Sequence, residues 1–289
     1  MALSVNTNPG AFIALQSLTA TNRELAITQN RVSTGLAISG VEDSSSGFII
    51  AQNIRADISG LDALQSSLDN AAGAVDVAIE AGETISDLLI EARGLALAAS
   101  DNGLAQESRD ALQDNFQAIL AQINSVVNSA EFNGINVVNT NATNVVSAVI
   151  SLDGGLAGPP LGTVSPANNI LVDGIDLSTG ATGLNITNSQ FGSAASAQSA
   201  ITEIDAAIEG ATGLNTRLAQ LGAAATQIEL QAEFFTNLQD TLTVGVGNIV
   251  DADLARESAE LQALQVQQQL GLTALGIANA APSALLSLF

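Results

Sequence analysis

The C-terminal stretch of the chain, residues 261–289, reads LQALQVQQQLGLTALGIANAAPSALLSLF and contains no charged side chain. Burying a large apolar side chain stabilises a protein by roughly 1.5 to 3 kcal/mol, and this stretch is rich in them, among others Leu261, Leu264, Leu272, Leu275, Leu285, Leu286, Leu288 and Phe289. The opposite end, residues 1–22, is also uncharged, and the first charged residue is Arg23. Two uncharged, apolar ends on one acidic chain predict a subunit that packs against other subunits.

The composition of the chain limits its fold class. With 289 residues, 47% of them hydrophobic, and a mean hydropathy of +0.33, it is not a disordered polymer and is long enough for one large or two smaller domains. Aromatic residues make up only 3%, without Trp or Tyr. The apolar surface therefore consists of Leu, Ile, Val and Ala, which favour helix-on-helix packing.

The charged and reactive residues exclude several function classes. The net charge is −22 and all seven basic residues are Arg, so the basic footprint of a nucleic-acid groove is missing. The chain has no Cys and no His, which excludes thiolate sites, Ser-His-Asp triads and His-ligated zinc. Asp173 and Asp176 form a carboxylate pair, but turn chemistry explains them more simply. We expect no nucleic-acid partner, no catalytic residue, no metal, no cofactor and no enzyme.

We expect neither a secretory signal nor a membrane anchor. The N-terminus carries Asn8 and Pro9 where a signal peptide has a continuous apolar block. Residues 270–289 are long enough for a tail anchor, but Asn279 and Pro282 interrupt them and no basic residue flanks them. The sequence therefore predicts no membrane insertion.

A helical pattern begins near residue 15. Its positions alternate at spacings of three and four residues, as in a coiled-coil seam: Leu15, Leu18, Asn22, Leu25, Gln29, Val32 and Leu36. Polar residues at two of these positions weaken a helix pair but restrict its register; a helix half-exposed to solvent is the alternative. Gly35, Gly40 and residues 42–47 then predict a loop or a bent connector.

Two more helices precede a change in composition. The same alternation continues from about residue 47 to residue 100, residues 101–103 (Asp-Asn-Gly) supply a turn, and a third helix extends to about Ala130. From residue 134 to about 192 the chain is rich in Asn, Gly, Thr and Ser. Short apolar runs within this segment predict hairpins and loops.

Helical periodicity returns at about Ala194 and continues to the C-terminal stretch. Because two amphipathic arms bracket the insert, the two halves of the chain are expected to pack on each other. The predicted fold class is mainly α, with long coiled-coil-like helices from both chain ends forming discontinuous domains and a small β-hairpin-rich middle insert.

Motifs in both arms resemble the bacterial flagellin family. They lie within residues 1–139 and about 195–289 and leave the middle uncovered: Asn6-Thr7-Asn8, RVSTGL (31–36), Glu42-Asp43, QNIR (52–55), Gly60-Leu61, EFNG (131–134), NIVDAD (248–253) and the ending from Pro282 to Phe289. The resemblance implies a compact flagellin with a short middle region. Such a chain would be a structural subunit that forms the flagellar filament as a homopolymer and serves swimming motility.

The resemblance also implies a division of the chain. Residues 1–40 and 250–289 would form the inner tube of the filament, residues 41–139 and 193–249 the outer tube, and residues 140–192 a solvent-facing β/loop insert. The residues expected to carry self-assembly are large apolar residues from both ends: Leu15, Leu18, Leu25, Val32, Leu261, Leu264, Leu272, Leu275, Leu285, Leu286 and Phe289.

Export and partners follow from the same resemblance. It implies secretion through the narrow flagellar channel without a cleaved signal, and contacts with an export chaperone, the filament cap and the hook-junction proteins. The absence of Cys and the scarcity of bulky aromatic residues are compatible with passing such a channel unfolded. A hook–filament junction protein of the same superfamily is the nearest alternative, and the compact middle and the flagellin-type C-terminus argue against it.

Two positions depart from the family pattern. In flagellins that activate an innate animal receptor, an Arg precedes the Arg-x-Leu-Ala stretch and a Glu lies on the following helix. Aligned on residues 93–96 (RGLA) and 132–134 (FNG), these positions are Glu91 and Asn115 in this chain. One change reverses a charge and the other removes one, so we expect poor recognition by that receptor.

Overall fold

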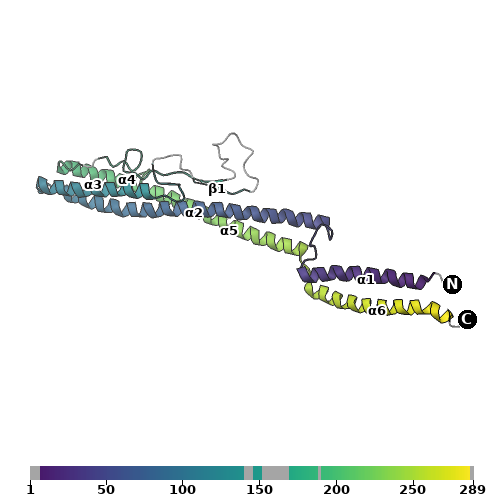
Figure 1. Ribbon diagram of the computed structural model, residues 1–289. Coiled ribbons are helices and arrows are strands. Elements are labelled where there is room, and N and C mark those ends of the chain that lie inside the picture. Colours follow the sequence, from purple (N-terminus) through teal and green to yellow (C-terminus); the bar gives the residue numbers. More distant parts are fainter. Residues whose placement is uncertain (1–6, 140–145, 152–168, 188–189, 287–289) are drawn as a thin grey trace. The chain divides into compact units, whose positions relative to one another are not determined.

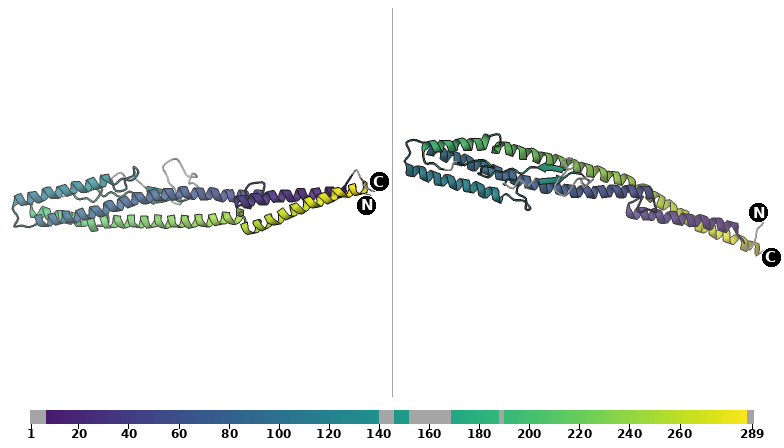
Figure 2. Two further views of the ribbon diagram at one scale, coloured as in Figure 1. Left: turned by 60° about the horizontal axis from the view of Figure 1, so that its bottom comes forward. Right: turned by 90° about the horizontal axis from the view of Figure 1, so that it is seen from above.

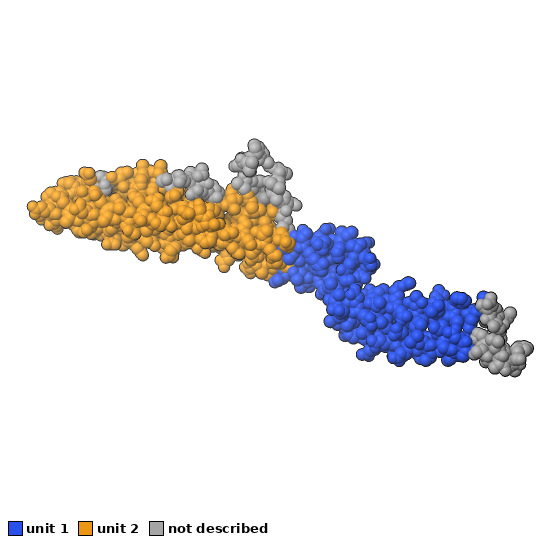
Figure 3. Space-filling model, in the orientation of Figure 1, with its two compact units in different colours: residues 1–58, 240–289 blue, residues 59–239 orange. Residues whose placement is uncertain are grey.

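The computed structural model describes residues 7–139, 146–151, 169–187 and 190–286. Six helices and two short strands follow one another along this part of the chain (Figure 1): α1 (Pro9–Thr34), α2 (Ser45–Ala99), α3 (Gln106–Ser129), β1 (Val146–Val149), β2 (Asn169–Val172), α4 (Ala194–Glu209), α5 (Leu214–Val250) and α6 (Leu254–Leu286). The chain divides into two compact units, which Figure 3 colours separately. Unit 1 comprises residues 1–58 and 240–289, and unit 2 comprises residues 59–239.

In unit 1, α1 and α6 lie side by side, so the two ends of the chain form one antiparallel helix pair (Figure 2). Local signals set the bounds of α1. The Asn8 side chain accepts a hydrogen bond from the Ala11 N–H at 3.2 Å, and Pro9 follows at the first helical position. At the other end, Gly35 adopts a left-handed conformation with φ 73° and donates to the Arg31 carbonyl at 2.8 Å.

Unit 1 contains two connectors: the first, residues 35–44, joins α1 to α2, and the second, residues 251–253, joins α5 to α6. The two connectors and the helix ends beside them are hydrogen-bonded to each other. Leu36 and Asp251 form an antiparallel bridge, the Ala37 N–H donates to the Val250 carbonyl at 2.7 Å, and the Ala252 N–H donates to the Gly35 carbonyl at 2.9 Å. A small apolar cluster supports them: Ala51, Val246 and Val250 at its centre, with Leu36, Ile38, Ile54, Ile58 and Ile249 around them.

Unit 2 is a helical bundle made from α3, α4 and the parts of α2 and α5 between residues 59 and 239. Its largest buried side chains come from all four helices and from the segment between β2 and α4: Leu61, Leu68, Ile85, Leu89, Phe116, Ile123, Leu177, Phe191, Ile204, Leu214, Leu221 and Ile228. The rings of Phe116 and Phe191 lie 4.9 Å apart, centroid to centroid. Buried Arg109 secures the turn between α2 and α3 by donating to the carbonyls of Ala99 and Asp101, each at 2.9 Å.

The middle of the chain carries a two-stranded antiparallel sheet in which Val146 is opposite Val172 and Val149 is opposite Asn169. Val146, Ala148, Ile170 and Val172 are buried while their neighbours point outward, which is the alternation of a half-buried strand.

The predicted fold class is confirmed: long helices lie at both ends and a small antiparallel sheet lies in the middle. The helix expected from about residue 47 to 100 is α2, and the apolar runs expected to form strands contain β1 and β2. Much of the predicted 140–192 insert lies outside the described residues. Its role, and the assignment of the other ranges to an inner and an outer tube, stay predictions.

Candidate self-assembly surface

The seam between α1 and α6 is filled mostly by small and medium-sized side chains. On α1, the buried and half-buried positions recur at spacings of three and four residues: Ala11, Ala14, Leu18, Thr21, Leu25, Thr28 and Val32. They face a matching row on α6: Glu257, Leu261, Leu264, Gln268, Gly271, Leu275 and Ala278. This 3,4 spacing is the geometry of coiled-coil packing.

Leu18 on α1 packs closely against a glycine on α6. A methyl group on Gly271 would lie 3.1 Å from Leu18 Cδ1, tighter than ordinary carbon contacts. Polar side chains cross the seam on both sides of this contact between Leu18 and Gly271. Gln268 donates to the Asn22 side chain at 2.7 Å, and Asn8 donates to the Ala278 carbonyl at 2.6 Å. Together these contacts define one antiparallel register for the two chain ends.

An ion pair joins the last turn of α1 to the first turn of α6. Arg31 Nη1 lies 3.3 Å from Glu257 Oε1. The Glu257 residue is only 8% exposed, and the Arg31 side chain is 35% exposed. Arg31 Nε and Glu257 Oε2 are buried and have no hydrogen-bond partner within the described residues. The pair is therefore monodentate, and Asp43 is a second acid that interacts electrostatically with Arg31.

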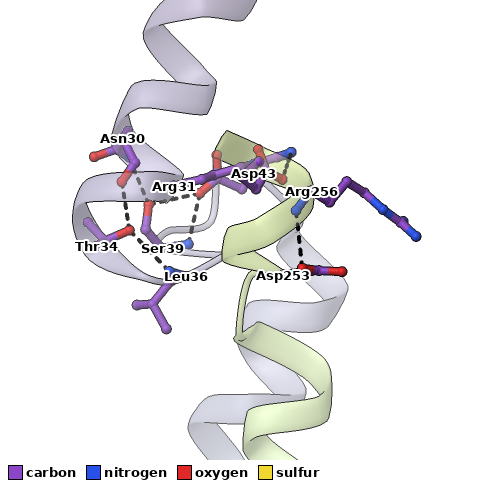
Figure 4. Close-up of polar contacts among 9 residues, drawn as sticks. Asn30, Arg31, Thr34, Leu36, Ser39, Asp43, Asp253 and Arg256 are labelled. Carbon is purple, nitrogen blue, oxygen red and sulfur yellow. Dashed lines mark hydrogen bonds and ion pairs between the residues drawn. The ribbon is translucent and has the colours of Figure 1, made fainter. Parts of the chain in front are cut away.

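Asp43 holds the first connector in shape (Figure 4). Its Oδ2 accepts hydrogen bonds from the Ser39 N–H and the Ser39 hydroxyl, both at 2.9 Å, and from the Gly40 N–H at 3.2 Å. Asn30 on α1 donates to the same Ser39 hydroxyl at 3.3 Å, so the connector is tied to the helix that precedes it. The hydrogen bonds from Ser39, first from its backbone and then from its hydroxyl, lower the pKa of Asp43.

We predict that Asp43→Asn weakens the connector at neutral pH but has no effect in strong acid. Because the folded pKa of Asp43 lies below its unfolded value of about 3.9, its stabilisation is complete above that value and is lost as pH falls through the folded pKa. Thermal unfolding of parent and variant should differ by about 2 °C at pH 7 and converge near pH 2. An equal difference at both pH values would contradict the role of the charge.

The outward faces of α1 and α6 carry the larger apolar side chains. Ile13 is 68% exposed and Ile277 is 73% exposed. Further exposed large residues on these two helices are Phe12, Leu15, Ile27, Leu254, Val266, Leu270 and Leu272. A single chain thus leaves these large apolar side chains in water, while its own seam buries leucines together with smaller residues. Exposed apolar surface of this extent marks an interaction site.

The structure separates the predicted self-assembly residues into three groups. Leu18 and Leu264 are buried in the seam, and Leu25, Val32, Leu261 and Leu275 are half-buried there. Leu15 and Leu272 point outward, with Leu15 49% exposed. The helix α6 extends through Leu285 and Leu286, whose side chains lie outside the description, as does the whole of Phe289.

Sequence reasoning missed the small seam residues and the Arg31–Glu257 pair. Ala11, Ala14 and Gly271 carry no apolar signal of their own, although they fall on the 3,4 spacing of Leu18 and Leu25. The ion pair joins residues 226 positions apart, and no local pattern connects them. Its one sequence signal is that both charged residues lie near the inner ends of the two helices, beside or on the seam rows.

The two positions that depart from the receptor-activating pattern are both accessible. Glu91 lies on α2 and Asn115 on α3, and both side chains are exposed. Neither takes part in the core of unit 2.

The described residues were searched for metal-binding groups and for membrane-spanning helices. They contain no group of three or more acidic, Cys or His side chains placed to hold a metal ion. None of their helices combines the length and the apolar character that crossing a bilayer requires.

Paired chain ends and outward apolar faces define a class: a mainly helical protein that exposes apolar surface near both of its ends. Comparisons narrow that class. Residues 5–143 match the bacterial flagellin N-terminal helical region, and residues 201–289 match the bacterial flagellin C-terminal helical region. The chain belongs to the bacterial flagellin family.

Named relatives cover the whole chain. Flagellin FljK of Caulobacter vibrioides is 41% identical over 100% of both chains, and a flagellin of Brucella melitensis is 37% identical over 99% of both. Flagellin C of Rhizobium meliloti is 33% identical over 99% of both. The chain is therefore a structural subunit of the flagellar filament, and the comparisons give no support to the hook–filament junction alternative.

Proposed function

We propose that this flagellin polymerises through the outward faces of α1 and α6, which a neighbouring copy covers. The observation that carries the proposal is the exposure of large apolar side chains: the internal seam covers one row of each helix, while Phe12, Ile13, Leu270 and Ile277 on the other faces remain exposed. Each of these side chains gains roughly 1.5 to 3 kcal/mol when a neighbour buries it fully. Contacts between different faces of identical subunits generate an open helical polymer.

The finer architecture follows the family pattern. Residues 1–40 and 250–289 form the inner tube, residues 41–139 and 193–249 the outer tube, and residues 140–192 face solvent. The uncharged ends support an inner position, because no charged side chain has to be desolvated when they are buried. The carboxylate-rich sequence between them suits an outer, hydrated position.

We also place the chain outside the cell, exported unfolded through the flagellar channel. An export chaperone, the filament cap and the hook-junction proteins are its further partners. The absence of Cys supports this route, because no disulfide forms to block threading.

Sedimentation and electron microscopy of the purified chain test the proposal. We expect salt-induced filaments that sediment, and limited proteolysis that removes both ends from the free chain but not from the polymer. We expect this cleavage because the single seam between α1 and α6 offsets little of the entropy of ordering both helices. Absence of filaments, or equal protection of the ends in both states, would contradict the proposal.

A second consequence concerns the innate animal receptor. We expect this flagellin to be a weak agonist, because Glu91 and Asn115 present the wrong charges on exposed helical positions. In a receptor-reporter assay, Glu91→Arg combined with Asn115→Glu should raise signalling at least about tenfold, the effect of one restored interface contact. Strong signalling by the parent chain would rule the expectation out. Filament formation by the variant serves as the folding control.

A further inference from the structure

Three of the seven arginines have no side-chain partner among the described residues. The other four are engaged inside the chain: Arg31 with Glu257, Arg93 with Asp205, and Arg109 and Arg217 with main-chain carbonyl oxygens. Arg23, Arg55 and Arg256 are exposed and, within the described residues, make no side-chain hydrogen bond or ion pair. Figure 4 shows the Arg256 side chain extending away from Asp253, whose carboxylate accepts from the Arg256 main-chain N–H.

These three arginines all belong to unit 1. Unit 2 has 20 acidic residues against three arginines, a net charge of −17, and all three arginines are engaged. Unit 1 has nine acidic residues against four arginines, a net charge of −5. The unpaired positive charges are thus confined to the part of the chain that carries the candidate self-assembly surface.

Two of the three lie on the outward apolar rows of that surface. On α6, Arg256, Ala263, Leu270 and Ile277 follow at intervals of seven residues, which places them on one face of the helix, and all four are exposed. On α1, Arg23 lies one turn before exposed Ile27. Any copy that covers these apolar side chains also removes water from the neighbouring guanidinium groups.

We propose that Arg23, Arg55 and Arg256 pair with carboxylates of a second copy of this chain when the polymer forms. The proposal rests on the proposed function. Copies that each carry a charge of −22 repel one another, and an arginine that loses water at an interface without meeting an acid is costly. Exposed carboxylates are abundant on every copy, and the planar guanidinium binds them with two parallel hydrogen bonds.

The test replaces all three arginines and compares the result with a charge-matched control. Arg23→Gln, Arg55→Gln and Arg256→Gln together should raise the critical concentration for polymerisation about tenfold, the combined effect of three partly exposed ion pairs. In the control, Gln122→Glu, Gln198→Glu and Gln227→Glu bring the net charge to the same −25 at exposed positions of unit 2. We expect the control to change the critical concentration less than about twofold.

The outcomes separate this proposal from the function on which it rests. If the arginine variant polymerises like the parent, the pairing is wrong. If both variants are impaired equally, the pairing is also wrong, and the net charge accounts for the effect. If the parent forms no polymer at all, the proposed function fails, and this proposal with it. Circular dichroism of each free chain checks that the helices are intact.

Discussion

Deletion of residues 270–289 is expected to abolish polymerisation while leaving a largely helical chain. Within the described part, the deletion removes the exposed side chains of Leu270, Leu272 and Ile277, together with Gly271, on which Leu18 packs. Unit 2 keeps its own core and loses none of its residues. Sedimentation should therefore find the truncated chain in the supernatant, with circular dichroism still showing helix. Normal filaments from the truncated chain would refute the proposed surface.

Point substitutions distinguish the contribution of the outer face of α6 to polymerisation from that of its seam with α1. Leu270→Gln, Leu272→Gln and Ile277→Gln together keep the chain length and change only exposed positions. If these side chains are buried by a neighbour, the critical concentration should rise at least about 100-fold, since each contributes well over 1 kcal/mol on burial. Polymerisation at the concentration of the parent would show that the truncation acts through the seam instead.

The helices and strands could be predicted because their signals are local. The 3,4 spacing of apolar residues extends over most of α2, Gly35 supplies the left-handed residue that ends α1, and Asp101-Asn102-Gly103 falls in the turn after α2. The strands themselves were indicated by two short apolar runs. These features depend on neighbours within a few residues, which the sequence displays directly.

The choice of seam residues on α1 could not be predicted in the same way. From Leu18, a 3,4 alternation continues equally well through Asn22 and Gln29 or through Thr21 and Thr28. The structure uses Thr21 and Thr28 and leaves Leu15 exposed. What decides between the rows is the partner helix, whose Gly271 makes room for Leu18 and whose Gln268 reaches Asn22 from the side. A rule that ranks positions by apolarity alone therefore selects residues of both kinds, buried ones such as Leu18 and exposed ones such as Leu15.

The Arg31–Glu257 pair gives the largest expected effect of a single substitution. Arg31→Met leaves Glu257, which is only 8% exposed, without its one opposite charge among the described residues. Breaking a wholly buried pair costs about 3–5 kcal/mol. Because the Arg31 side chain is 35% exposed, water screens part of the interaction, and we expect the pairing of α1 with α6 to weaken by about 2–3 kcal/mol.

Hydrogen exchange on the assembled protein measures this loss where it occurs. Amides of α1 and α6 should exchange faster in Arg31→Met, by the 30- to 150-fold that corresponds to about 2–3 kcal/mol, while amides in the core of unit 2 keep their protection. Adding Glu257→Leu should restore most of the protection, because no uncompensated charge is then buried. Arg93→Met, which breaks the exposed pair with Asp205, is the matched control and should change little. If Arg31→Met and Arg93→Met behave alike, or if Glu257→Leu fails to rescue, burial of the pair is not what stabilises the joined chain ends.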